Sequence, residues 1–79
     1  MARILPTKET IIITSLTNQL SRRGATDISI IENSQLGYPY YQVSFVQDDM
    51  YCRYTVSKQY VERYGAFTTI KNIYKELKL

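Results

Sequence analysis

Histidine and tryptophan are absent from this sequence, and cysteine occurs once, at Cys52. Without histidine there is no imidazole to act as a general base, a metal ligand or a member of a catalytic triad. A single cysteine cannot form an intrachain disulfide, and a structural zinc site needs about four Cys or His ligands. We therefore expect neither a disulfide-stabilised nor a zinc-stabilised fold. We also expect no metal and no cofactor.

Long apolar runs and glycine-rich loops are missing as well. No segment approaches the roughly 18 apolar residues of a membrane span, and Met1 to Pro6 show no signal-peptide core. The three glycines are isolated, so no phosphate-binding loop is present. The acidic pair Asp48-Asp49 is typical of a turn. We expect a cytoplasmic protein that is not an enzyme, with no membrane partner and no small-molecule substrate.

What remains is a chain of 79 residues, of which 44% are hydrophobic. This length predicts one small globular domain spanning residues 1–79. Because so short a chain buries a small core, association with another chain is a common source of additional stability. Eight tyrosines supply rings with polar tips, which suit half-buried positions and contact surfaces.

The first element is predicted to be a helix that begins after Thr7, a suitable N-cap. Ile12, Leu16 and Leu20 recur every four residues, and Gly24 provides a stop after a basic last turn. The alternative is a strand, because the segment from residue 10 to 16 begins with a β-branched run.

Three strands and a broken helix follow. The strands are predicted at Asp27–Glu32, Tyr40–Gln47 and Met50–Val56, with Asn33–Pro39 as a loop and Asp48-Asp49 as a hairpin turn. Ser57 caps a helix that Gly65 ends or kinks, and a last helix carries Phe67, Ile70, Ile73, Tyr74 and Leu77 at helical spacing. We expect Tyr60, Tyr64 and Phe67 to pack into the core at the corner near Gly65.

This order predicts an α+β fold of the order α-β-β-β-α, with an antiparallel three-stranded sheet and the helices on one of its faces. Alternation along the strands assigns the side chains to faces. The helix-facing set is Ile28, Ile30, Tyr41, Val43, Phe45, Cys52, Tyr54 and Val56. The opposite set is Ser29, Ile31, Tyr40, Gln42, Ser44, Val46, Tyr51, Arg53 and Thr55.

This second, uncovered face is the leading candidate for function. Tyrosine and arginine are common anchors of protein interfaces, so we expect a small interaction module that associates with itself, as a homo-oligomer, or with a protein partner. The predicted partner-binding residues are Tyr40, Gln42, Tyr51 and Arg53, with Ile31 and Val46 around them. The alternatives for this face are ordinary cross-strand pairing on a solvated sheet and the stacking of single-stranded bases.

Charge distribution suggests a different class of partner. Both ends of the chain are basic, whereas residues 27–49 contain four acidic residues and no basic one. The candidate nucleic-acid-binding residues are Lys71, Lys75, Lys78, Arg22 and Arg23. Basic residues near helix C-termini, on a solvated face, are the simpler explanation. A third alternative is a small accessory or assembly protein of a phage or mobile element.

Two segments bear on RNA binding. The start of the last helical region, Ser57-Lys58-Gln59-Tyr60, has one lysine, and the loop Asn33–Pro39 has no basic residue. The order of predicted elements is similar to that of the double-stranded-RNA-binding domain, which carries a lysine cluster at the first place and contacts a minor groove with the second. Because both features are missing, the sequence is not assigned to that family.

Overall fold

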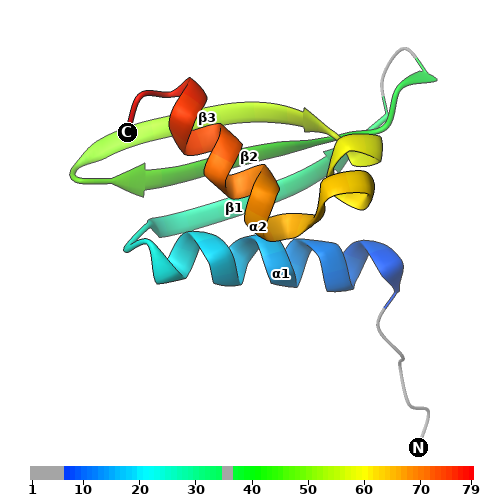
Figure 1. The fold of residues 1–79 in the computed structure, drawn as a ribbon, viewed down its shortest axis with the longest axis horizontal. Helices are drawn as coiled ribbons and strands as arrows, with labels where there is room; N and C mark the ends of the chain where they lie inside the picture. The colour runs from blue at the N-terminus through cyan, green and yellow to red at the C-terminus, as the bar shows by residue number, and fades with distance from the viewer. Residues whose placement is uncertain (1–6, 35–36) are drawn as a thin grey trace, which may run out of the picture.

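The computed structural model describes residues 7–34 and 37–79 (Figure 1). Helix α1 spans Lys8–Arg22, and strands β1, β2 and β3 span Thr26–Asn33, Tyr40–Gln47 and Met50–Ser57. Helix α2 spans Lys58–Glu76. The predicted α-β-β-β-α order is confirmed. The predicted helix over residues 10–16 is confirmed and its strand alternative is excluded, while residues 35 and 36 of the predicted loop lie outside the described residues.

Local signals explain the bounds of α1. The Thr7 side chain accepts a hydrogen bond from the Thr10 backbone N–H at 3.2 Å, as an N-cap does. At the other end Gly24 adopts φ +86°, and the backbone N–H groups of Gly24 and Ala25 donate to Ser21 and Leu20. This pair of bonds is a Schellman motif, whose left-handed residue favours glycine. The predicted cap and stop are both confirmed.

The sheet is antiparallel, with the order β1-β2-β3. Strand β2 pairs with β3 without interruption from Gln47↔Met50 to Tyr40↔Ser57. Asp48 and Asp49 form the turn between them with φ values of +53° and +64°, which short acidic side chains tolerate. Pairing of β1 with β2 shifts register between Thr26 and Ser29.

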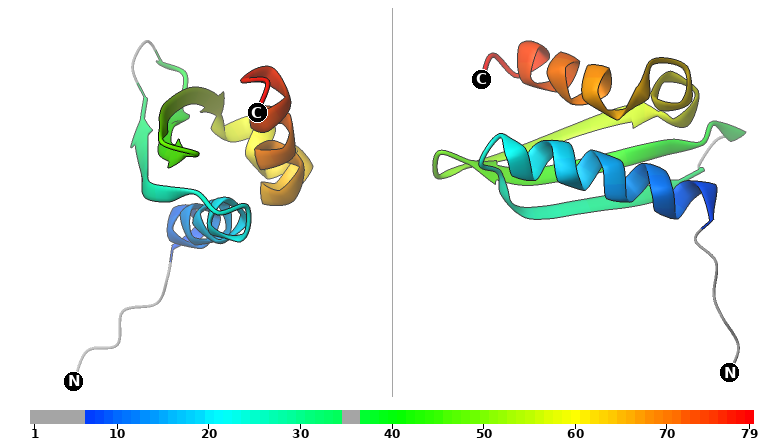
Figure 2. Two further views of the ribbon diagram at one scale, coloured as in Figure 1. Left: turned by 90° about the vertical axis from the view of Figure 1, so that its left-hand side faces the viewer. Right: turned by 60° about the horizontal axis from the view of Figure 1, so that its bottom comes forward.

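Both helices lie on the same side of the curved sheet, α1 along β1 and α2 across the other strands (Figure 2). Between sheet and helices lies the core, formed by buried Leu16 and Leu20 of α1, Val61, Ile70, Ile73 and Tyr74 of α2, and the inner face of the sheet. The predicted inner set is confirmed, since Tyr41, Val43 and Phe45 are fully buried. None of the described helices is long and apolar enough to span a membrane.

Helix α2 bends at Gly65, which has φ +85° and ψ +167°. The predicted break is therefore confirmed, and it lets both halves of α2 bury side chains, Val61 before it and Ile70 after it. The prediction that aromatic rings fill this corner is wrong for two of the three residues. Tyr64 is 50% exposed and Phe67 is 59% exposed, because the smaller Val61 and Ala66 face the core instead.

Candidate functional site

The outer face of the sheet is a surface that the described helices leave open. No described helix lies over it (Figure 2), and its side chains on the edge strands reach solvent. Tyr51 is 68% exposed and Ile31 is 56% exposed, which are high values for large apolar side chains. Such exposed apolar surface marks candidate interaction sites in small proteins.

The four predicted partner-binding residues form one diagonal across this face. Tyr40 and Gln42 lie two residues apart on β2, and Tyr51 and Arg53 lie two residues apart on β3. With its amide oxygen turned toward Arg53, Gln42 accepts hydrogen bonds from the guanidinium Nε, at 2.7 Å, and Nη2. This contact joins the two halves of the diagonal and holds the Arg53 side chain against the sheet.

The two tyrosines themselves do not meet. Tyr40 pairs with Ser57 and Tyr51 pairs with Val46, so six residues of β3 separate their rows. At about 3.3 Å per residue the rings lie roughly 20 Å apart. The arrangement is a long strip with an aromatic ring at each end, rather than one aromatic cluster.

Charge is scarce on this strip. Among the described outward-facing residues that pair in regular register, Arg53 carries the one ionised side chain, and Asp27, also exposed, lies in the register shift of β1. Small hydroxyl side chains occupy the centre, where Ser44 Oγ donates to the Ser29 carbonyl at 3.4 Å. Protein interfaces are depleted of charge at their centres and enriched in tyrosine and arginine. Nucleic-acid surfaces need several cations instead.

The predicted nucleic-acid-binding residues occupy another part of the molecule. Lys71 and Lys75 are exposed on α2, but Lys78 lies beyond its end with φ +58°, so the three predicted lysines do not share one helical face. Arg23 makes contacts within the fold. Its guanidinium lies 4.8 Å from the centre of the Tyr74 ring, and its backbone carbonyl accepts a hydrogen bond from the Gln47 side-chain amide.

Acidic residues share that end of the molecule. The C-terminal ends of both helices and the β2–β3 turn lie at the same end of the sheet (Figure 1). The turn contributes Asp48 and Asp49, and Glu76 is the last residue of α2. Helix C-termini also carry partial negative charge. These acidic groups reduce the positive field that the basic residues at this end could offer to a phosphate backbone.

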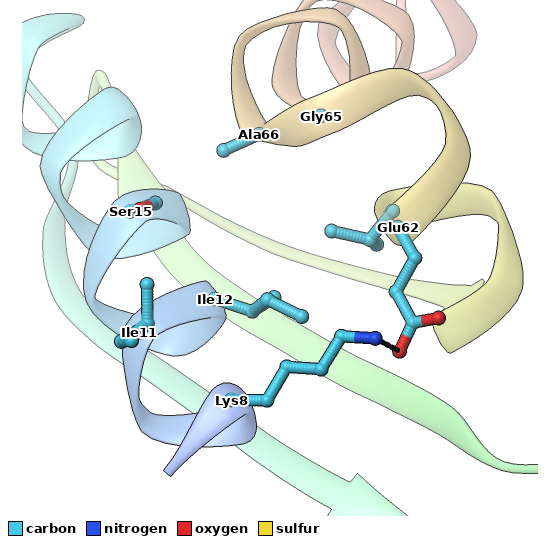
Figure 3. A pocket seen from close by; sticks show the side chains of 8 residues that line it. Lys8, Ile11, Ile12, Ser15, Glu62, Gly65 and Ala66 are labelled. Atoms are coloured by element: carbon cyan, nitrogen blue, oxygen red, sulfur yellow. Dashed lines mark ion pairs between the residues drawn. The ribbon is translucent and has the colours of Figure 1, made fainter. Parts of the chain in front are cut away.

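A hollow between α1 and α2 was not predicted from the sequence. It has a volume of about 290 Å³ and is lined by Lys8, Ile11, Ile12, Ser15, Val61, Glu62, Gly65 and Ala66. Figure 3 shows the Lys8–Glu62 ion pair, 3.3 Å long, along one side of it. Nothing in the linear sequence brings residues 8–15 and 61–66 together, so only the packing of the helices reveals it. Its volume lies at the lower limit of small-molecule sites.

At the opposite end from the acidic turn, Lys58 joins three elements. Its Nζ lies 2.6 Å from Glu32 of β1 and 3.5 Å from Glu9 of α1, and 5.6 Å from the centre of the Tyr41 ring. The hydrogen bond to Glu32 is the main cause that raises the pKa of Lys58, while a backbone hydrogen bond and Lys58 lower the pKa of Glu9. All charges in this cluster are paired, so its role is to tie the helix N-termini to the sheet.

Cys52 and the acidic turn have local structural explanations. Cys52 is buried, and its Sγ lies 3.6 Å from the Met50 carbonyl. Within residues 7–34 and 37–79, no group of three or more Cys, Asp or Glu side chains is arranged to hold a metal ion. No family model, no curated protein and no solved structure matches this chain.

Proposed function

We propose that this protein is a small non-enzymatic interaction module whose outer sheet face binds protein, either a partner or a second copy. The observation that carries the proposal is the Tyr40–Gln42–Arg53–Tyr51 diagonal on a face with one cation and no covering helix. Tyr51 supplies exposed ring area, and Arg53 is preordered by Gln42 with guanidinium hydrogens left for a carboxylate.

The low charge favours protein over nucleic acid as the partner. A surface that follows a phosphate backbone gains affinity from several cations, and this face has one. Elsewhere, Lys8 and Lys58 are paired with acidic side chains of the fold. We place the module in the cytoplasm, where a lone thiol such as Cys52 stays reduced.

Site-specific photo-crosslinking in the source cells tests the proposal. A photoreactive residue at Ile31, on the outer face, is expected to give one dominant protein adduct. Tyr51→Ala is expected to abolish that adduct, because it removes the most exposed ring of the strip. The matched control is the same photoreactive residue at Thr14, which is exposed on α1 and remote from the sheet face. No adduct from Ile31, or equal adducts from both positions, contradicts the proposal.

Sedimentation separates the two kinds of protein partner. An Ile31 adduct of twice the monomer mass, together with a sedimentation coefficient that Tyr51→Ala lowers, identifies a second copy. An Ile31 adduct of a different mass identifies a different partner. A protein that stays monomeric and gives no adduct has no docking function at this face.

A further inference from the structure

The free edge of β3 differs from the outer face and from the other edge of the sheet. On β1, the register shift near Asp27, which has φ +51°, breaks the regularity of the edge, and α1 lies alongside. Bulges and covering elements are the usual protection of edge strands. Strand β3 has no register shift along its eight residues, and it contains no proline, glycine, lysine or acidic residue.

The hairpin register identifies the backbone groups at this edge. A two-residue turn makes Gln47 and Met50 a hydrogen-bonded pair, and such pairs alternate along the ladder. Met50, Cys52, Tyr54 and Val56 therefore direct their N–H and C=O groups toward β2. Tyr51, Arg53 and Thr55 direct theirs away from the sheet, where no described strand pairs with them.

We propose that β3 pairs antiparallel with β3 of a second copy about a two-fold axis at Tyr54, giving a continuous six-stranded sheet. In this register Arg53 is opposite Thr55 of the second copy, and Tyr51 is opposite Ser57. An axis at Arg53 would set two guanidinium groups directly opposite each other, which is destabilising. An axis at Cys52 would pair only the turn-proximal part of the strand.

The two ends of β3 are complementary in shape under this symmetry. Met50, at the start of β3, is 59% exposed. At the other end, a hollow of about 220 Å³ is lined by Tyr54, Thr55, Val56, Ser57, Tyr60 and Asn72. Pairing about Tyr54 brings Met50 of the second copy just past Ser57, to this hollow. A flexible thioether beside the Tyr60 ring makes a favourable contact, and symmetry makes each contact twice.

The ends are complementary in charge as well. The first turn of α2 contains no acidic residue, so its positive dipole end is not matched by its own sequence. The Asp48-Asp49 turn of the second copy lies next to Met50 and arrives at this helix N-terminus. The pairing therefore adds acidic groups at this dipole end, beside the Glu32 and Glu9 carboxylates that pair with Lys58. It uses a different surface from the proposed docking face, so either proposal can fail alone.

Sedimentation from micromolar to millimolar concentration tests the pairing. We expect a monomer–dimer equilibrium that Thr55→Pro abolishes, because proline removes an outward N–H without touching the ladder with β2. Thr55→Val is the matched control and should dimerise like the wild type. Met50→Ala should raise the dissociation constant about tenfold. A protein that is monomeric throughout, or a dimer that survives Thr55→Pro, overturns the proposal.

Disulfide trapping tests the register of the pairing. It also tests whether the two β3 strands pair at all, if Thr55→Pro fails to fold. In a Cys52→Ala background, Tyr54→Cys places the two thiols across the axis, within the Cα separation that a disulfide accepts. Oxidation should give a covalent dimer from Tyr54→Cys and none from Thr55→Cys in the same background. Trapping by Thr55→Cys alone, or by neither variant, contradicts this register and with it the proposal.

Discussion

The inner and outer faces of the sheet are made by alternate residues of the same strands, yet they have opposite compositions. On β2, Tyr41, Val43 and Phe45 are fully buried, whereas Gln42 and Ser44 between them reach solvent. On β3, buried Cys52 and Val56 alternate with exposed Tyr51 and Arg53. Neighbouring positions along the chain therefore have different roles, and substitutions can separate stability from binding.

The difference also shows how the chain supports an open face. All the apolar side chains of both helices that are buried pack on the inner face, and the paired charges around Lys58 tie the helices to it. The outer face then contributes little to folding, because its side chains pack mainly against each other. A surface that contributes little to stability can present exposed aromatic side chains without a cost to the fold.

The largest loss of stability is expected from a substitution at the centre of the inner face. Phe45→Ala removes a fully buried ring that stacks on Tyr74 with 5.5 Å between ring centres. The cavity and lost burial should reduce the free energy of unfolding by about 3–5 kcal/mol. Tyr51→Ala on the outer face should change it by at most about 0.5 kcal/mol. Urea unfolding of both variants checks this, and equal losses would remove the distinction between the faces.

The next largest loss of stability is expected from a substitution at the bend that keeps both halves of α2 over the inner face. Gly65 has φ +85° and ψ +167°, a region that is nearly closed to other residues, while the space around a Cβ there is empty. Gly65→Ala should therefore cost about 1–3 kcal/mol through backbone strain alone. Thr68→Ala, at an exposed position of α2, is a control that changes helix propensity without this strain. A Gly65→Ala variant as stable as wild type would show that α2 relaxes at the bend.

Much of this fold follows from the sequence because local and long-range signals agree. Thr7, Gly24 and Ser57 cap the helices where the apolar spacing begins or ends, and strict alternation in Tyr40–Gln47 assigns its faces. The β-branched run at the start of α1 favours a strand locally, but the Ile12–Leu16–Leu20 spacing buries more apolar surface as a helix.

The parts that the sequence could not supply depend on packing between distant segments. Phe67 has the spacing of a core residue, but the bend at Gly65 turns the second half of α2 so that Ala66 faces inward. Lys78 has helical spacing from Lys75, yet the C-terminal Schellman motif places it outside the helix. The Gln42–Arg53 contact depends on side-chain conformation, because the hairpin register sets Gln42 opposite Thr55 and Arg53 opposite Ser44.

Removing the hydroxyl groups of two buried tyrosines, Tyr74 and Tyr41, should have smaller effects on the free energy of unfolding, and these effects should have opposite signs. The Tyr74 hydroxyl donates to Gln47 Oε1 at 2.6 Å, so Tyr74→Phe should cost about 1 kcal/mol. The Tyr41 hydroxyl is the one buried side-chain polar atom of the described residues without a hydrogen-bond partner. Tyr41→Phe should therefore stabilise the protein by up to about 1 kcal/mol. Thermal unfolding measures both, and a clear loss in Tyr41→Phe would show that its hydroxyl is satisfied.

The same hydroxyls make stability depend on alkaline pH. Burial is the main cause that raises the pKa of Tyr41 and of Tyr74 above 10.0. A raised pKa in the folded state means that the stabilisation is complete below the pKa of the unfolded chain and is lost as pH rises through the folded pKa. The free energy of unfolding should fall above pH 10.0. The fall should be shallower in the Tyr41→Phe, Tyr74→Phe double variant, and an unchanged slope would contradict this origin.

The smallest stability effect is expected from the polar pair on the outer face. Arg53→Ala removes the guanidinium that Gln42 accepts from, but the amide stays accessible to water, so the free energy of unfolding should change by at most about 0.5 kcal/mol. Val43→Ala, one strand over and facing the core, is the matched inner-face variant and should cost several times more. If Arg53→Ala instead lost as much as Val43→Ala, the pair would hold the sheet together. The open face would then be part of the fold rather than a surface available for binding.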